Sequence, residues 1–153
     1  MIATPVYVLD TNIISEVIKN QSDDNVTAWL LQHQENLYIT AITIGELWEG
    51  AYHLPLGKKR ESLLLTIERI NRGYTERTFA YDGAAAQIYA RMRDDRSRCG
   101  HQLSVEDGMI AAICVAHNAT LATRNTKDFA QLGTELMNPF EEPAPDVTIV
   151  TMQ

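Results

Sequence analysis

Tyr7-Val8-Leu9-Asp10-Thr11-Asn12 is a short apolar run that ends abruptly in a carboxylate. The run follows Pro5 and is apolar without alternation, as expected of a parallel strand that helices cover on both faces. Asp10 would then lie at the carboxyl end of that strand, the edge of an open α/β sheet where ligands bind. Asp10 is therefore a candidate for chemistry, although an Asx turn or a helix cap would explain a single Asp here equally well.

The length and composition indicate one ordinary globular domain. A chain of 153 residues can bury a substantial core, and contents of 45% hydrophobic and 22% charged residues are typical of soluble domains. No apolar run is long enough to span a bilayer, and the N-terminus lacks the features of a secretory signal, so we expect no membrane association and a cytoplasmic location. Cys99 and Cys114 form no zinc pattern, which predicts two free thiols.

The formal net charge of −7 argues against a protein that coats nucleic acid by electrostatics alone, because Lys and Arg neutralise the phosphates. A nucleic-acid substrate would require divalent metal on a carboxylate cluster, or local basic groups, to offset the repulsion. An acidic surface also suits a basic protein partner. The candidate basic groups are Arg91, Arg93, Arg96 and Arg98 in one stretch and Arg124 with Lys127 in another.

Strand-like and helix-like segments alternate along the chain without a linker or repeat, which predicts an α/β fold with a parallel sheet. Ser22 is expected to cap a helix that buries Trp29. Residues 147–150 could form an edge strand, an exchanged arm or a tail. The further strands are expected at 37–40, 78–81 and 119–123, and the further helices at 13–18, at 47–74 as a hairpin broken near 55–57, after Asp82 and at 109–116.

Three further acids occupy positions like that of Asp10. Thr43 with Glu46, and Ser104 with Asp107, have the spacing of a capping box, so helix capping would explain each acid by itself. Asp128 follows the strand expected at 119–123, and a role in a turn would explain it. All of these acids nevertheless lie at the carboxyl end of a strand or in the turn that follows it.

A parallel sheet brings such positions to one edge, where the repulsion among carboxylates is costly unless cations lie between them. Oxygen ligands without His or Cys favour Mg²⁺ or Mn²⁺, and such sites commonly cleave phosphodiesters by activating water. No ligand or nucleophile pattern includes His33, His53, His101 or His117. The sequence therefore predicts a metal-dependent hydrolytic centre at Asp10, Glu46, Asp107 and Asp128.

Four short motifs in this order resemble those of PIN-domain nucleases, most closely the VapC and FitB group, which are toxins of type II toxin–antitoxin and plasmid stability modules. The motifs are Leu-Asp-Thr-Asn at 9–12, Thr-Ile-Gly-Glu-Leu at 43–47, Glu-Asp-Gly-Met-Ile-Ala-Ala at 106–112 and Ala-Thr-Arg-Asn-Thr-Lys-Asp-Phe at 122–129. The resemblance covers residues 6 to about 140. It implies a three-layer α/β/α sandwich with a central parallel sheet and a metal-dependent endoribonuclease that cuts single strands, leaving a 5′-phosphate and a 3′-hydroxyl.

The resemblance also implies the roles of particular residues. The catalytic acids, which would hold one or two Mg²⁺ (or Mn²⁺) ions, are Asp10, Glu46, Asp107 and Asp128, and the supporting polar residues are Asn12, Thr123 and Asn125. A homodimer is implied, as is a small antitoxin that blocks the acidic site and contacts operator DNA. Residues 1–140 would form a single PIN-like nuclease domain and residues 141–153 a C-terminal tail. One departure is Gly108, which weakens a helix where the family commonly has Ala or another helix former.

Two other interpretations stay open at this point. One is a non-catalytic PIN-like module in which the acids serve only as helix caps and partner contacts. The other is a phosphatase with Asp10 as covalent nucleophile, as in haloacid-dehalogenase-like enzymes. Their motif has a second Asp two positions further on, where this chain has Asn12.

Overall fold

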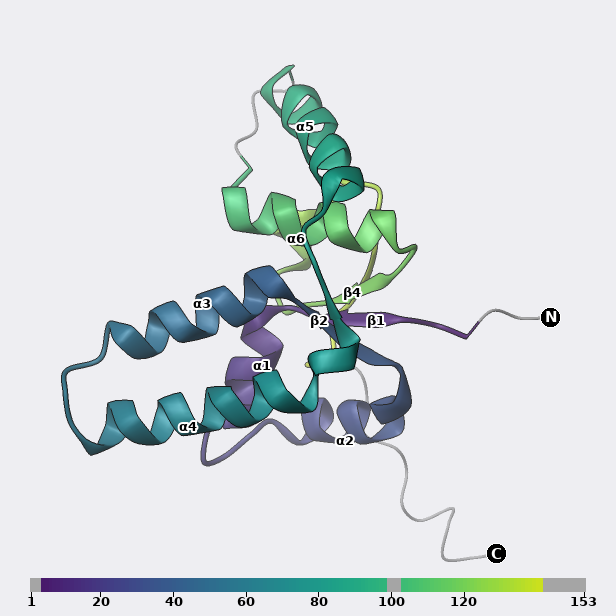
Figure 1. Cartoon of the computed structure of the whole chain (residues 1–153). Coiled ribbons are helices and arrows are strands. Elements are labelled where there is room, and N and C mark those ends of the chain that lie inside the picture. Colours follow the sequence, from purple (N-terminus) through teal and green to yellow (C-terminus); the bar gives the residue numbers. More distant parts are fainter. Residues whose placement is uncertain (1–3, 99–102, 142–153) are drawn as a thin grey trace, which may run out of the picture.

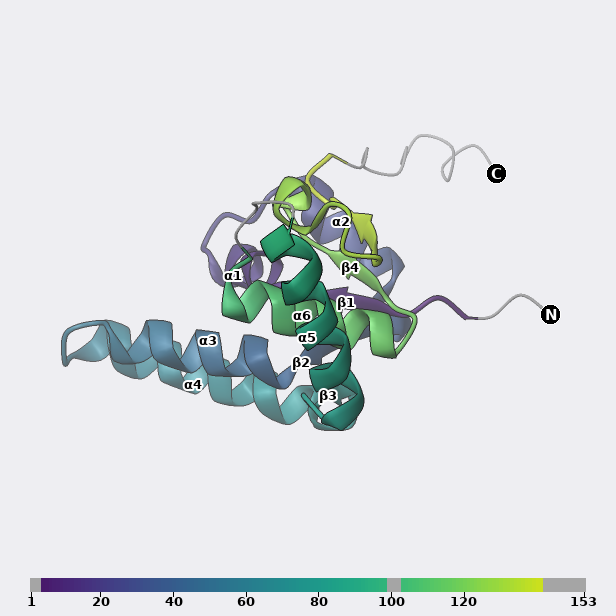
Figure 2. The ribbon, with the colours of Figure 1, turned by 90° about the horizontal axis from the view of Figure 1, so that it is seen from above.

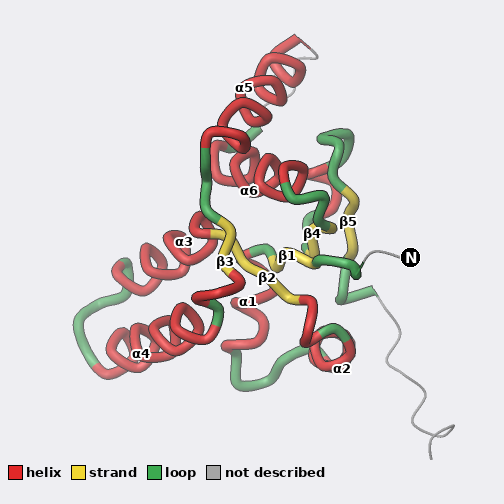
Figure 3. Tube along the Cα trace, turned by 45° about the vertical axis from the view of Figure 1, so that its right-hand side comes forward, coloured by secondary structure: helices red, strands yellow, loops and turns green. Residues whose placement is uncertain are grey.

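A five-stranded parallel sheet forms the centre of the protein (Figure 3). The computed structural model describes residues 4–98 and 103–141. Its strands, in the spatial order β3-β2-β1-β4-β5, all run in the same direction. They are β1 (Tyr7–Leu9), β2 (Leu37–Thr40), β3 (Thr78–Phe79), β4 (Thr120–Ala122) and β5 (Glu135–Met137). The apolar run before Asp10 is thus the central strand.

Helices cover both faces of the sheet, which confirms the predicted α/β/α sandwich (Figures 1 and 2). Val8 points into the core under α5 and α6, while its neighbour Leu9 points into the core formed with α1 to α4, because side chains alternate along a strand. The helices in the described part of the chain are α1 (Thr11–Ile18), α2 (Asp24–Gln32), α3 (Ala41–Tyr52), α4 (Lys58–Gly73), α5 (Gly83–Arg98) and α6 (Val105–Ala116).

The helices α3 and α4 form a hairpin that projects from the rest of the molecule (Figures 1 and 2). The break lies between Tyr52 and Lys58, around the predicted Pro55 and Gly57. Ile67 of α4 is fully buried in the core that it shares with α3. None of the helices within residues 4–98 and 103–141 is long and apolar enough to cross a membrane.

Two predicted helix starts were wrong. The cap of α2 is Asp23, whose carboxylate accepts two backbone N–H groups of the first turn, whereas the Ser22 hydroxyl donates to the carbonyl of Glu16. Helix α3 begins directly after β2, and its cap is Thr40, whose hydroxyl accepts the N–H of Thr43. The strand runs into the helix without a loop, so its last residue supplies the extended backbone that a cap requires.

The strand β5 was not predicted from the sequence. It is three residues long and lies at the sheet edge, where Leu136 pairs with Leu121 of β4. A strand this short shows no readable periodicity. Residues 147–150, where an edge strand was considered, lie outside the described residues, as do Cys99 and His101. Cys114 is a buried free thiol, as expected.

Gly108 has a packing role that the sequence did not show. It is buried in α6, and a Cβ atom at this position would lie 2.5 Å from Cε2 of Tyr89 in α5 and 3.0 Å from Cδ2 of Leu103. Real Cβ contacts are not this close, so any other residue would displace the Tyr89 ring. The departure from a good helix former is therefore explained by the close approach of α5 to α6.

Candidate functional site

Asp10 lies at the carboxyl end of β1 and is 5% exposed. Its Oδ1 accepts the backbone N–H of Thr11 at 2.8 Å, and its Oδ2 accepts the Thr123 hydroxyl at 2.8 Å and the Asn12 amide at 3.1 Å. Burial raises the pKa of Asp10, and repulsion from Asp107 adds to this effect, while the hydrogen bonds oppose it. Asp10 caps α1 and is at the same time a carboxylate held in one orientation.

Thr123 and Asn12 connect the end of β4 to the end of β1. The buried Thr123 hydroxyl donates to Asp10 and accepts both the Asn12 amide at 3.3 Å and the backbone N–H of Asn125 at 3.0 Å. The Asn12 Oδ1 accepts the backbone N–H of Arg124 at 3.1 Å. The three residues expected to support the acids, Asn12, Thr123 and Asn125, therefore lie in one hydrogen-bond network around Asp10.

Glu46 lies in the second turn of α3 rather than the first. Its Oε1 accepts the hydroxyl of Thr11 at 2.7 Å, so it is directed to the start of α1. The predicted capping box was wrong, because the N–H of Thr43 is inside the helix and bonds to Thr40. Burial raises the pKa of Glu46, and repulsion from Asp10 and other nearby acids adds to it.

Asp107 lies in the first turn of α6. Its backbone N–H donates to the hydroxyl of Ser104 at 3.2 Å, which confirms Ser104 as the cap of this helix. Burial raises the pKa of the Asp107 side chain, and repulsion from Asp128 and Glu106 contributes. The carboxylate is thus partly desolvated among other negative charges.

Asp128 is exposed, on the short 3₁₀ turn Thr126–Phe129 that follows β4. Its backbone N–H donates to the carbonyl of Asn125 at 3.0 Å. Its charge acts on Asp107, but Asp128 does not line the cavity that the other three acids share. The structure therefore brings Asp10, Glu46 and Asp107 together and leaves Asp128 beside them.

The three acids share a cavity of about 420 Å³ at this edge of the sheet. Residues that the sequence reasoning missed also line it, chief among them Thr11, Glu16, Lys19 and Phe140. Glu16 of α1 and Lys19, the residue directly after that helix, lie four and seven positions after Asn12, the spacing that places side chains on one helix face. That periodicity, continued from Asn12, was the signal available in the sequence.

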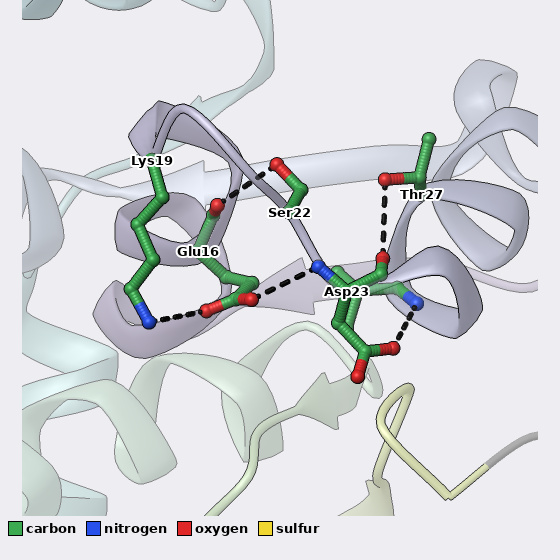
Figure 4. Close-up of polar contacts among 6 residues, drawn as sticks. Glu16, Lys19, Ser22, Asp23 and Thr27 are labelled. Atoms are coloured by element: carbon green, nitrogen blue, oxygen red, sulfur yellow. Dashed lines mark hydrogen bonds and ion pairs between the residues drawn. The ribbon is translucent and has the colours of Figure 1, made fainter.

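Glu16 is a second buried acid of this cavity, and it is 7% exposed. Figure 4 shows its carboxylate between Lys19 and the backbone of Asp23. Its Oε2 lies 2.8 Å from Nζ of Lys19, and its Oε1 accepts the backbone N–H of Asp23 at 3.0 Å. The hydrogen bonds to Lys19 and to the backbone of Asp23 hold the pKa of Glu16 below its usual value, and the bond to Lys19 has the larger effect. Glu16 differs in this from the other cavity acids, since its charge is already compensated.

The donor chemistry of the cavity fits a hard divalent cation. Asp10, Glu46 and Asp107 offer carboxylate oxygens whose pKa values are raised chiefly by burial and further by repulsion from neighbouring acids. A bound cation would stabilise the ionised form of these carboxylates. Within residues 4–98 and 103–141, no three His, Cys, Asp or Glu side chains are placed so that they could hold a metal ion together. Mg²⁺ does not require such a group, because it keeps several waters and takes one or two carboxylates.

The chain belongs to the PIN-domain family, whose model matches residues 7–135. It is 38% identical over 136 residues to the VapC ribonuclease Y4jK of Sinorhizobium fredii, which covers 88% of this chain and 97% of the relative. It is 36% identical over 136 residues to the toxin FitB of Neisseria gonorrhoeae, with coverage of 88% and 98%. The structure of FitAB bound to the IR36 DNA fragment superposes with a TM-score of 0.83 at 34% identity, covering 92% of this chain and 100% of the other. The resemblance seen in the four motifs is confirmed.

Proposed function

We propose that this protein is a Mg²⁺- or Mn²⁺-dependent endoribonuclease that acts as the toxin of a type II toxin–antitoxin module. The observation that carries the proposal is the meeting of Asp10, Glu46 and Asp107 on one cavity, with Asp10 held by three hydrogen bonds. The similarity to a VapC ribonuclease and to the toxin FitB supports the reaction and the biological role.

The residues that would hold the cation are Asp10, Glu46, Asp107 and Asp128. A bound Mg²⁺ or Mn²⁺ supplies Lewis-acid activation of water and neutralises charge on the phosphate. Asp128 would act from outside the cavity wall, so its contribution is expected to be the smallest of the four.

The chain's own polar groups prepare the acids for this role. Thr123, Asn12 and the N–H of Thr11 donate to Asp10, and these donors favour the ionised carboxylate against the effect of burial. The Thr11 hydroxyl orients Glu46 in the same way. Fixed ligand orientation matters because in-line attack on a phosphate requires the reacting groups to be aligned before reaction.

We extend the proposal to partners and location. The protein would act in the cytoplasm as a homodimer, bound by a small antitoxin that blocks the acidic cavity and contacts operator DNA on behalf of both proteins. The net charge of −7 supports a basic partner, and the FitAB complex with a DNA fragment supports assembly on DNA. Residues 1–140 would form the nuclease domain, which the family match over residues 7–135 supports. The tail expected at 141–153 lies, apart from Glu141, outside the described residues.

The test is cleavage of a panel of tRNA, ribosomal RNA and messenger RNA by the purified protein without its partner. Each RNA is incubated with Mg²⁺, Mn²⁺ or EDTA, beside the Asp10→Asn variant, which preserves the shape of the side chain and removes its charge. We expect cleavage that requires the metal and is lost in the variant. Equal cleavage by both proteins would indicate a contaminating nuclease. Cleavage that stays with the purified Asp10→Asn variant through a further purification step would contradict the assignment of Asp10.

Two further measurements, metal binding and trapping of a covalent phosphate, separate the other interpretations. Absence of cleavage together with absence of Mg²⁺ and Mn²⁺ binding would favour a non-catalytic module that only binds partners. A trapped acyl-phosphate on Asp10 would favour the phosphatase. Both oxygens of Asp10 already accept hydrogen bonds, which suits a ligand in a fixed orientation better than a nucleophile.

A further inference from the structure

The cavity that contains the acids is also lined by two positively charged residues and an aromatic residue, which are Lys19, Arg124 and Phe140. We call these three residues the cationic wall. The proposed metal chemistry does not use them, and they come from three separate places in the chain. Lys19 directly follows α1, Arg124 follows β4 and Phe140 follows β5. Their convergence therefore requires an explanation of its own.

Arg124 is held in place but retains free hydrogen-bond donors. Its backbone N–H donates to Oδ1 of Asn12, and its guanidinium carbon lies 4.4 Å from the centroid of the Phe140 ring. The salt bridges found in the described part of the chain pair Glu16 with Lys19 and Glu68 with Arg72. Arg124 therefore has no carboxylate within salt-bridge distance there, although its charge acts on Glu16 from further away. The ring covers the flat face of the guanidinium, and the N–H groups at its edge stay available for an anion.

Phe140 is a firm support for this arrangement. Its backbone N–H donates to Oδ1 of Asn138 at 3.0 Å, and its carbonyl accepts the amide of Asn25 at 3.1 Å. The backbone of Phe140 is thus attached both to the loop after β5 and to the first turn of α2. A fixed ring lowers the entropy that Arg124 loses when it binds a ligand.

Lys19 is fixed through the buried Glu16. Its Nζ lies 2.8 Å from Glu16, yet the Lys19 side chain is 59% exposed, so two of its three donors can still face the cavity. Glu16, Lys19 and Arg124 together carry a formal charge of +1, because one acid is opposed by two bases, while Asp10, Glu46 and Asp107 line the same cavity. The cationic wall is therefore a local positive group in a protein whose net charge is −7, and such a group attracts anions.

We infer that the cationic wall binds a backbone phosphate of the RNA next to the phosphate that is cleaved. The inference rests on the proposed function and identifies the substrate as a polynucleotide held at two successive phosphates. A phosphate fits better than a base, because Arg124 already occupies the face of Phe140 on which a base would stack. A guanidinium edge together with an ammonium group matches the oxygens of a phosphodiester.

The first test measures binding in the Asp10→Asn background, where RNA should not be cut and one repelling charge of the acidic end is removed. A fluorescent single-stranded RNA oligonucleotide is titrated at several salt concentrations. We expect Arg124→Ala to weaken binding about tenfold. The slope of log K against log[salt] should fall by about 0.7, the value for one lost phosphate contact on a single strand.

Two further variants and a control complete this measurement. Lys19→Gln retains a donor to Glu16 and should weaken binding less than Arg124→Ala, and Arg124→Lys should restore part of the lost affinity. The control is Arg72→Ala, which removes an arginine from α4 outside the cavity. Circular dichroism melting shows that each variant is folded. If Arg124→Ala and Arg72→Ala have the same affinity and salt slope, the inference is wrong.

The second test uses the otherwise wild-type protein and RNA in which one phosphate at a time is replaced by a neutral methylphosphonate. One position beside the cut should reduce cleavage about tenfold, and Arg124→Ala should remove this sensitivity because the contact is already lost. Equal sensitivity in both proteins would overturn the inference. If the wild-type protein cuts no RNA, the proposed function fails, and the binding test still decides whether the cationic wall contacts phosphate.

Discussion

The hydroxyl of Thr11 donates to Oε1 of Glu46 at 2.7 Å, which joins the first turn of α1 to the second turn of α3. These helices follow β1 and β2, so the contact fixes the two strand ends relative to each other at the cavity. Thr11 lies one position after Asp10, and the same turn therefore positions two of the acids. The hydroxyl also lies 3.3 Å from that of the buried Thr43, which limits its freedom to rotate.

Replacing Thr11 by Val should reduce metal affinity and RNA cleavage by about tenfold or more. The shape is retained, but Glu46 loses the group that orients it, and residues that orient metal ligands typically have effects of this size. Calorimetric titration with Mn²⁺ and initial cleavage rates measure the effect. Thr27→Val is the matched control, because its exposed hydroxyl binds only a backbone carbonyl of α2. Equal losses in both variants would argue against a special role for Thr11.

Thr123→Val should destabilise the protein by about 1–3 kcal/mol and also reduce cleavage. The buried hydroxyl forms hydrogen bonds with Asp10, Asn12 and Asn125. Its removal leaves polar groups in the interior without a partner. Thr123→Ser retains the hydroxyl and should recover most of the activity. Urea unfolding and cleavage rates test the pair. A Val variant as stable and active as the Ser variant would show that the network is dispensable.

Gly108→Ala should destabilise the protein by about 1–3 kcal/mol, although Ala favours helices by about 1 kcal/mol. The new methyl group would collide with the Tyr89 ring and with Leu103. Gly45→Ala in α3 is the control, since a methyl group there would meet nothing within 4 Å. That change should be neutral or stabilising. Thermal melts that shift in the same direction for both variants would refute the packing explanation of Gly108.

The acids should make the metal-free protein less stable as the pH rises. The folded-state pKa values of Asp10, Glu46 and Asp107 lie above those of the unfolded chain, so the folded protein retains protons that the unfolded chain has released. Stability that is present below the ordinary carboxyl pKa is therefore lost as the pH rises through the raised values. Mg²⁺ should reverse this loss, because it compensates the charges that form.

Glu46→Gln should accordingly raise the melting temperature of the metal-free protein at neutral pH by about 1–3 °C. This corresponds to roughly 0.5 kcal/mol after allowance for the solvent that reaches this half-buried group. The variant should also gain less stability from Mg²⁺ than the wild type. Glu49→Gln, an exposed change three residues further along α3, is the control. A melting temperature that falls in Glu46→Gln and is unchanged in the control would contradict the repulsion.

Much of the fold could be predicted because its signals are local. The apolar run before Asp10 and the apolar helix α6, which is rich in small residues, indicated a buried parallel sheet. Both contribute buried residues to the core of the structure. The boundary of α3 was missed because Thr40 and Thr43 are equally good caps by residue type. The strand was expected to end at Thr40, as it does, but the residues did not show that the helix begins there without a loop. The strand β5 was missed because its three residues depend on pairing with β4 rather than on their own pattern.

The candidate site could be predicted only in part. The positions of Asp10, Glu46 and Asp107 follow from the rule that strand ends meet at one edge of a parallel sheet. The contacts between elements do not, since Thr11 reaches Glu46 across 35 positions and Asn12 reaches Thr123 across 111. Phe140 gave no signal in the sequence, because nothing in the residues around it indicates that its ring would cover Arg124.

The central claim is that the acidic cavity is a divalent-cation site, and Mn²⁺ binding followed by electron paramagnetic resonance tests it most directly. The RNA-free protein is titrated beside Asp10→Asn, Glu46→Gln, Asp107→Asn and Asp128→Asn, with Glu49→Gln as control. We predict saturable binding to the wild type, a loss of about tenfold or more for the three cavity variants, a smaller loss for Asp128→Asn and none for the control. Wild-type affinity in all the variants, or no binding to the wild type, would contradict the account.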